Sequence, residues 1–240
     1  MNDDFISKLD QKLAVLIDPD QHSTDSLFDF MANLKSIKPD YILIGGSLIT
    51  NSSVDQTAKA IKALTKIPVV LFPGHFTHLT NEVDAILLLS LISGRNPDLL
   101  IGQHVIAASQ LKTLKDKLIP TGYMLIDGGC PTSVSYISNT NPIPRDKPEI
   151  ACATAIAGQS IGQKVVYMDA GSGAKYPISD EMIRSVSKSI DIPLIVGGGI
   201  RTVEAINQAW ENGANLVVVG NALEEDPSIL SKNMAQLKHR

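Results

Sequence analysis

Three glycine-rich segments in the last third of the chain could bind a phosphate group. They are residues 167–173, 197–200 and 217–221, and each closes an apolar run typical of a β-strand. Glycine lets backbone amides approach an anion without Cβ bulk, and helix patterns after the second and third segments would add helix N-termini. We therefore predict one phosphate site built by three successive strand-to-helix junctions.

Asp18 and Ser47 are candidates for a metal site. Asp18 ends the first apolar run, and Ser47 follows the second, so both fall on the rim of neighbouring strands. Mg²⁺ takes one or two carboxylates, waters and phosphate oxygens of the substrate, so one carboxylate and one hydroxyl suffice. The structural alternative is that Asp18 caps the loop at Pro19 and Asp20, and that Ser47 caps a turn.

Asp169 is the candidate proton acceptor. It lies in the first glycine-rich segment, where a hydroxyl of a phosphorylated polyol would lie beside the phosphate. The alternative is that its carboxylate only orients backbone amides. Tyr167 could reach the phosphate or be a core aromatic residue, and Ser172 could bind the phosphate or hold the turn. Arg201 could pair with the anion, but its position favours a solvated first turn.

The histidines and cysteines do not point to chemistry. His75 and His78 are three residues apart, but no further cysteine or histidine lies nearby, so we assign both to a loop. Cys130 and Cys152 have neither metal-ligand nor redox-pair spacing, which fits a reducing compartment. Trp210 lies at helical spacing from other apolar residues, which predicts that its side chain packs in the core.

Eight mostly aliphatic runs predict eight parallel strands that position these residues. Their nearly continuous apolar character is expected for strands covered on both faces, and helical patterns lie between most of them. A chain of 240 residues has the usual length of one (β/α)₈ barrel. We therefore predict a single TIM-barrel domain over residues 1–240, with strands at residues 13–17, 41–44, 69–72, 85–89, 122–126, 164–168, 194–196 and 216–219.

Two connections depart from a regular barrel. Residues 73–84 are too few for a crossover helix with two loops, so the third helix should be missing or reduced. An absent helix would uncover an apolar strand flank for a long ligand or a partner subunit. The longest connection, residues 127–163, should form a loop over the barrel mouth and then a helix over residues 150–161.

Composition excludes several classes of protein. The net charge is −4, and no run of lysine or arginine supplies the basic surface that nucleic-acid binding needs. The apolar stretch at residues 85–92 is too short to span a bilayer, and residues 1–4 lead into no signal segment. We expect a cytoplasmic protein that forms a homo-oligomer and makes at most transient contact with a membrane surface.

Taken together, the motifs resemble those of geranylgeranylglyceryl phosphate synthases, and most closely the second group of that family. The resemblance covers residues 13 to about 225. It rests on Leu-Ile-Asp-Pro-Asp at 16–20, Ile-Gly-Gly-Ser at 44–47, Leu-Phe-Pro-Gly at 71–74, Leu-Ser-Leu-Ile-Ser-Gly-Arg-Asn-Pro at 89–97, Tyr-Met-Asp-Ala-Gly-Ser-Gly-Ala at 167–174, Gly-Gly-Gly-Ile at 197–200 and Val-Gly-Asn-Ala at 219–222.

The resemblance implies transfer of a polyprenyl group from its diphosphate to the 3-hydroxyl of sn-glycerol 1-phosphate. The products would be diphosphate and a precursor of ether phospholipids, with Mg²⁺ as cofactor. Asp18 and Ser47 would hold the metal ion, and Asp169 would be catalytic. The prenyl chain would lie along the flank without a third helix. The residues implied to hold glycerol 1-phosphate are Tyr167, Met168, Asp169, Ala170, Gly171, Ser172, Gly173, Gly198, Gly199, Gly220 and Asn221.

Two positions depart from the family pattern. Many members have glutamate where this chain has Asp169, and some have a substrate-contacting lysine where this chain offers Leu16 or Gln21.

Two other functions remain open at this point. The same phosphate site would suit a phosphosugar isomerase or lyase on a TIM barrel, or a protein that binds prenyl lipids or phosphates without turnover.

Overall fold

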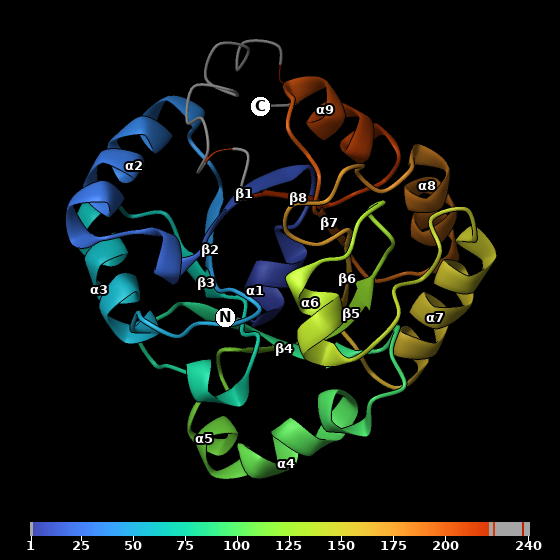
Figure 1. The fold of residues 1–240 in the computed structure, drawn as a ribbon, viewed down its shortest axis with the longest axis horizontal. Coiled ribbons are helices and arrows are strands. Elements are labelled where there is room, and N and C mark those ends of the chain that lie inside the picture. The colour runs from blue at the N-terminus through green and yellow to red at the C-terminus, as the bar shows by residue number, and fades with distance from the viewer. Residues whose placement is uncertain (1, 221–222, 224–236, 238–240) are drawn as a thin grey trace.

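Eight parallel strands form a closed barrel in chain order, and β8 pairs with β1 (Figure 1). The structure is a computed structural model that describes residues 2–220, 223 and 237. It confirms the predicted (β/α)₈ TIM barrel. The strands are β1 (Lys12–Ile17), β2 (Tyr41–Ile44), β3 (Val69–Leu71), β4 (Ala85–Leu91), β5 (Leu118–Leu125), β6 (Val165–Asp169), β7 (Leu194–Gly197) and β8 (Leu216–Val219).

The longer helices surround the barrel (Figure 1). Ser23 caps α2 by accepting from the Ser26 amide, and Ser179 caps α8 by accepting from the Met182 amide. A further short helix, α1 (Asn2–Ser7), places Phe5 edge-on against Tyr41 at the start of β2. The longer helices are α2 (Thr24–Ile37), α3 (Val54–Leu64), α7 (Pro148–Ser160), α8 (Asp180–Ser189) and α9 (Val203–Glu211).

Alternate residues of each strand build two separate cores. Leu13, Val15 and Ile17 of β1 pack outward in the large cluster shared with the helices, whereas Ala14 belongs to the cluster inside the barrel. Side chains of a strand point to opposite faces in turn, so a strand between two apolar layers must be apolar throughout. This explains why the strands appear in the sequence as continuous apolar runs.

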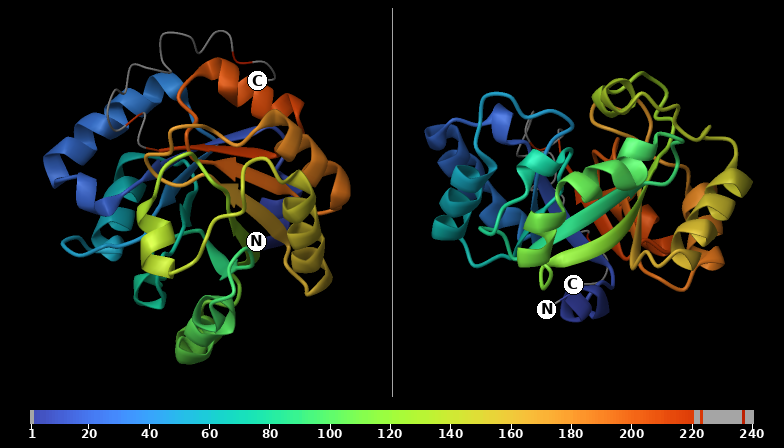
Figure 2. Two further views of the ribbon diagram at one scale, coloured as in Figure 1. Left: turned by 45° about the vertical axis from the view of Figure 1, so that its right-hand side comes forward. Right: turned by 90° about the horizontal axis from the view of Figure 1, so that it is seen from below.

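The connection between β3 and β4 contains no α-helix, as predicted. It forms only one 3₁₀ turn, η2 (Phe76–His78). Leu88 and Leu89 in the middle of β4 are only half-buried. Leu88 shares the outer face with Ile86, where no helix covers it, and Leu89 packs against the inner cluster. The next connection contains a π-helical turn, η3 (Asp98–Gly102), followed by α4 (Gln103–Ile106) and α5 (Ala108–Thr113), and these helices project from the barrel beside β4 (Figure 2).

Most boundaries agree with the prediction to within one or two residues, but the start of β5 differs by four. Strand β5 begins at Leu118, four residues before the predicted start at 122. The prediction missed these residues because a proline, Pro120, is unusual inside a strand. Pro120 still pairs opposite Leu88 and accepts from the Lys164 amide through its carbonyl oxygen. The long connection contains a short helix, α6 (Ser133–Ser138), that the sequence did not reveal, and α7 begins at Pro148 instead of 150.

No helix among the described residues is long and apolar enough to cross a membrane.

Candidate active site

A cavity of about 720 Å³ opens at the carboxyl ends of the strands. Its polar part is lined by the loops that follow β1, β2, β3, β6, β7 and β8, which include Asp18, Ser47 and Asp169. Its apolar part continues over β4 to the helices that follow it and to α6, with Leu88, Leu99, Ala107, Leu111 and Ile137 in its walls. One cavity therefore joins the predicted phosphate site, the predicted metal site and the flank without a third helix.

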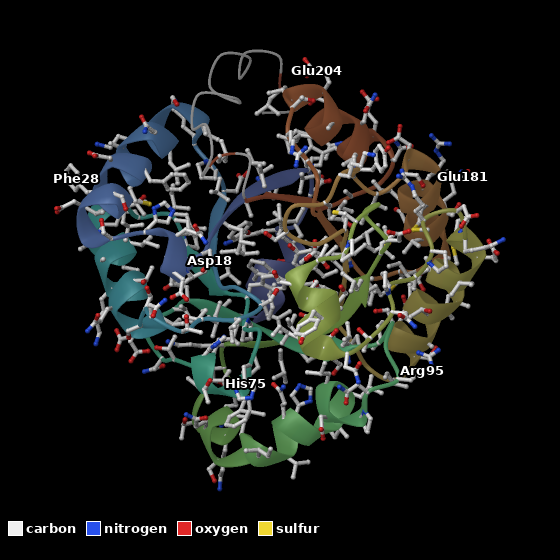
Figure 3. The ribbon with its side chains drawn as sticks, viewed as in Figure 1. Asp18, Phe28, His75, Arg95, Glu181 and Glu204 are labelled. Atoms are coloured by element: carbon white, nitrogen blue, oxygen red, sulfur yellow. The ribbon has the colours of Figure 1, made fainter. Side chains whose placement is uncertain are left out.

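Asp18 caps the loop after β1, as the structural alternative held, and it also lines the cavity. Its Oδ1 accepts from the Asp20 amide at 3.0 Å and so caps the 3₁₀ turn η1 (Pro19–Gln21). The carboxylate also lines the cavity, near the centre of the barrel mouth in Figure 3, and burial raises its pKa. A Cβ atom at Gly46 would lie 3.0 Å from Oδ2 of Asp18, so the carboxylate lies against the residue before Ser47.

The glycine-rich segments after β6 and β7 pack against each other. Gly171, Gly173, Gly198 and Gly199 have φ angles of +87°, +75°, +81° and +70°, which only glycine adopts without strain. A Cβ atom at Gly198 would lie 2.6 Å from the Ala170 nitrogen and 2.7 Å from the Gly171 nitrogen. The backbones of the two segments are thus in close contact at the cavity wall, where the Ala170 amide donates to the Gly197 carbonyl oxygen and the Gly171 amide to Asp169.

The third segment completes this wall in part. Gly220 lines the cavity, and a Cβ atom there would make only ordinary contacts, the nearest at 3.5 Å to Leu16. Asn221 lies outside the described residues, as does most of the helix pattern predicted after it.

Asp169 is 8% exposed and has two hydrogen bonds through different oxygens. Its Oδ1 accepts from the Gly171 amide at 2.7 Å, and its Oδ2 accepts from the Tyr123 hydroxyl at 2.8 Å. Burial raises the pKa of this carboxyl, although both hydrogen bonds act in the opposite direction. Asp169 therefore orients a backbone amide, as the structural alternative held, and also lines the cavity as a candidate base.

The remaining residues of the predicted phosphate set differ in their placement. Tyr167 and Ser172 line the cavity, and burial keeps the Tyr167 hydroxyl neutral by raising its pKa well above the ordinary value. Met168 and Ala170 are buried in the cluster between barrel and helices and do not line the cavity. Their side chains face away from the predicted substrate, so only their backbone atoms could contact it.

Several cavity residues were not identified from the sequence. His75 and His78 line the cavity through η2, and His75 lies between the barrel mouth and the helices beyond it (Figure 3). His104 also lines it and bonds through Nε2 to the Leu89 carbonyl oxygen at 2.9 Å. Tyr123 lies inside β5 without any flanking motif. The one available indication was that Tyr123 and Leu125 are two residues apart on the strand and so point to the same, inner face.

Arg201 is exposed, as predicted, but it too lines the cavity. Its Nη2 donates to the Ala174 carbonyl oxygen at 3.3 Å, which fixes the guanidinium near the glycine-rich segment after β6. The surface carboxylates Glu181 and Glu204 lie far from this region, on the outer faces of α8 and α9 (Figure 3).

The chain is similar to proteins named geranylgeranylglyceryl phosphate synthase. The one from Chitinophaga pinensis is 50% identical over 229 residues, or 95% of this chain and 90% of that protein. The one from Thermococcus gammatolerans is 42% identical over 216 residues, or 90% of this chain and 85% of that protein.

A solved structure shows the same fold at high similarity. It is (S)-3-O-geranylgeranylglyceryl phosphate synthase from Thermoplasma acidophilum in complex with substrate sn-glycerol-1-phosphate. Its TM-score is 0.89 at 31% identity, and the match covers 99% of this chain and 96% of that one. The model of the PcrB family matches residues 7–238. The chain therefore belongs to the PcrB family, together with these geranylgeranylglyceryl phosphate synthases.

Proposed function

We propose that this protein transfers a polyprenyl group from its diphosphate to the 3-hydroxyl of sn-glycerol 1-phosphate. The observation that carries the proposal is one cavity that joins a glycine-rich wall, a buried carboxylate and an apolar extension. These three features match a phosphate, a reacting hydroxyl and a long apolar tail in turn. The relatives named above support the same reaction.

Glycerol 1-phosphate would bind at the glycine-rich wall. Its phosphate would accept hydrogen bonds from amides of the segments after β6 and β7, with Gly220 allowing close approach. Oδ1 of Asp169 bonds to Gly171, within this wall, so the carboxylate is fixed relative to the phosphate. The 3-hydroxyl would then lie near Asp169, two carbons away from the carbon that bears the phosphate.

Asp169 would accept the proton that the 3-hydroxyl loses as its oxygen bonds to the prenyl carbon. Each carboxylate oxygen has two lone pairs, so the hydrogen bonds from Gly171 and Tyr123 leave room for a third donor. Burial makes the carboxylate a stronger base than an exposed aspartate. The leaving diphosphate would take the electron pair of the broken carbon–oxygen bond.

Mg²⁺ is the cofactor we propose, held by Asp18 and Ser47 with oxygens of the diphosphate. A carboxylate and a hydroxyl on adjacent strand ends are the hard oxygen donors that Mg²⁺ prefers. Among the described residues, no group of three or more His, Cys, Asp or Glu side chains could hold a metal, so substrate oxygens are needed. When bound, Mg²⁺ supplies charge that stabilises the diphosphate as it leaves.

The prenyl tail would lie in the apolar extension of the cavity. Leu88 and Leu89 of β4 are half-buried, Leu88 on the outer face that no helix covers, and both line the cavity together with Leu99 and Leu111. Burying a prenyl chain there would stabilise the complex by about 0.8 kcal/mol for each CH₂ group.

Incubation with geranylgeranyl diphosphate, Mg²⁺ and either enantiomer of glycerol phosphate tests the proposal. A fixed phosphate presents the two hydroxyl geometries differently, so we expect diphosphate release and an ether product by mass spectrometry with the 1-phosphate only. Similar kcat/KM for both enantiomers would contradict the assignment. A phosphosugar isomerase or lyase would release no diphosphate, and a binding protein would bind the substrates without turnover.

A further inference from the structure

We propose that Phe72 is a catalytic residue whose ring stabilises positive charge on the allylic carbon during prenyl transfer. This inference rests on the proposed function and adds a residue to its machinery. Phe72 follows β3, lines the cavity and is only partly buried. No polar group of its side chain could take another part in the reaction.

The backbone places Phe72 beside the predicted metal site. Its amide donates to the Ile44 carbonyl oxygen at 2.8 Å, which continues the pairing of β3 with β2. Gly45 must be glycine because a Cβ atom there would clash with the Phe72 carbonyl group. A Cβ atom at Gly74 would likewise clash with the Gly46 carbonyl oxygen, and it would lie 3.1 Å from the Ser47 carbonyl oxygen. The segment around Phe72 is thus packed against the loop that carries Ser47.

The ring of Phe72 reaches the acceptor side of the cavity. It stacks on Tyr167, with centroids 5.0 Å apart and planes at 25°, and lies 5.8 Å from the Tyr123 ring. Tyr123 bonds to Asp169, and Tyr167 is two residues before it on the same face of β6. Phe72 therefore lies between the residues proposed to hold the diphosphate and the carboxylate proposed to accept the proton.

Charge develops at this place in the reaction. As the C1–O bond of the prenyl diphosphate breaks, the electron pair leaves with the diphosphate, and the allylic carbons become positive. The glycerol 3-oxygen then bonds to C1, and its proton passes to Asp169. An aromatic face attracts a cation through its quadrupole, an effect that grows when water is excluded. A neutral substrate carbon gains nothing comparable, so the ring favours the transition state selectively.

The two tyrosines hold the Phe72 ring in place. Burial raises the pKa of both hydroxyls well above the ordinary value, so neither ring carries a negative charge that would compete for the cation. Both tyrosines are nearly inaccessible to solvent, at 4% for Tyr123 and 1% for Tyr167, and both rings pack against the Phe72 ring. The rest of the ring lines the cavity.

Replacement of Phe72 by 4-fluoro-, 3,5-difluoro- and 3,4,5-trifluorophenylalanine tests the proposal. Fluorine weakens the quadrupole of the ring with little change in shape, so a packing role would not respond. The readout is the single-turnover rate of ether formation from geranylgeranyl diphosphate and glycerol 1-phosphate with enzyme in excess. We expect a stepwise fall, reaching about 10-fold for three fluorines, and unchanged binding of the diphosphate substrate.

Phe5 provides the control because its ring also packs against a tyrosine, Tyr41, with centroids 4.8 Å apart, but does not line the cavity. The fluorinated series at Phe5 should leave the single-turnover rate unchanged. A flat rate across the Phe72 series, or an equal fall at both positions, would overturn the proposal. Phe72→Leu is a second variant, which should lower the rate more than the trifluorinated ring. If the unmodified protein formed no ether, the proposed function itself would fail.

Discussion

Asp169 connects the substrate site to the barrel through two hydrogen bonds, one from Gly171 and one from the Tyr123 hydroxyl. The first fixes the turn that begins the phosphate wall, and the second ties the carboxylate to β5. These two donors leave the carboxylate little freedom. The hydrogen bonds thus set the orientation of the carboxylate, and its basicity reflects burial, which raises its pKa, against the same hydrogen bonds, which lower it.

Tyr123→Phe should move the pH profile of the enzyme. The hydrogen bond from Tyr123 lowers the pKa of Asp169, so its loss raises a pKa that burial has already raised. Because the base must be unprotonated, the acid limb of kcat should shift to higher pH than in the wild type. The measurement is kcat from pH 5 to 9 at saturating substrates, where titration of the substrate phosphate affects both proteins equally. An unshifted acid limb would mean that Asp169 is not the base.

Asp18→Asn should abolish most turnover while leaving the fold intact. The asparagine Oδ1 can still accept from the Asp20 amide, so the cap of η1 is kept, but the charge that would bind Mg²⁺ is lost. We expect kcat to fall by at least about 100-fold, with an unchanged melting temperature. Asp18→Ala, which also loses the cap, should be less stable. Near-normal activity of Asp18→Asn at low Mg²⁺ would contradict the metal assignment.

Cavity residues that lie in a recognisable sequence motif could be predicted from the sequence, and cavity residues without one could not. Asp18, Ser47 and Asp169 stand at strand ends marked by glycine or proline, and strand ends face the mouth of a barrel. Tyr123 and His78 carry no such mark. Whether a residue inside a strand or a short loop reaches the cavity depends on the path of the chain around it, which spacing alone does not determine.

At the scale of elements, three strand ends and their glycines form the wall that we propose binds the phosphate, but these glycines do not tolerate a side chain equally. A Cβ atom at Gly199 would lie 2.8 Å from backbone atoms of Tyr176 and Pro177, so any substitution there displaces a loop. Gly220 has no left-handed φ and makes only ordinary contacts at the Cβ position. It is therefore the position where a methyl group can enter the cavity without disturbing the fold.

Gly220→Ala should weaken binding of glycerol 1-phosphate selectively. The methyl group would hold the phosphate away from the backbone amides, and loss of one hydrogen bond to a charged group costs about 1.5–3 kcal/mol. KM for glycerol 1-phosphate should rise by about 10-fold or more, with little change in KM for the prenyl diphosphate. The measurement is KM for each substrate, from steady-state kinetics with each substrate varied in turn. Equal increases in both constants would place the phosphate elsewhere.

The elements themselves could be predicted where a single physical signal dominates. The apolar runs predicted eight strands, and the short third connection predicted the missing helix because its length alone excludes one. Helix α6 lacks an apolar stripe of any length, and its cap is formed by Thr132 with Ser135, a pair common in turns as well. The start of β5 was missed because Pro120 has no N–H group to donate and joins the strand pairing only through its carbonyl oxygen.

At the scale of the whole molecule, the barrel is closed by contacts between distant parts of the chain. Pairing of β1 with β8 joins Lys12–Ile17 to Leu216–Val219. The indole nitrogen of Trp210 in α9 donates to the Lys12 carbonyl oxygen at 3.1 Å, across 198 positions of sequence. The predicted packing role of Trp210 is thus confirmed, with a hydrogen bond in addition. The single domain, the homo-oligomer, the cytoplasmic location and the contact with a membrane surface stay predictions.

Trp210→Phe tests whether the closed barrel unfolds as one domain. Loss of the bond to Lys12 and of part of the buried ring should lower the free energy of unfolding by about 1–3 kcal/mol. Trp210 is the only tryptophan, so its fluorescence in the wild type reports on closure of the barrel, while circular dichroism reports on all helices. Both signals should change at the same urea concentration in the wild type, because closure requires the first and last strands together.

The Trp210→Phe variant, followed by circular dichroism, should show one transition at lower urea. Phe28→Leu, at a residue 59% exposed on α2, should leave the transition unchanged. Separate transitions for fluorescence and circular dichroism would show that the ends of the chain unfold independently of the rest and would contradict a single domain.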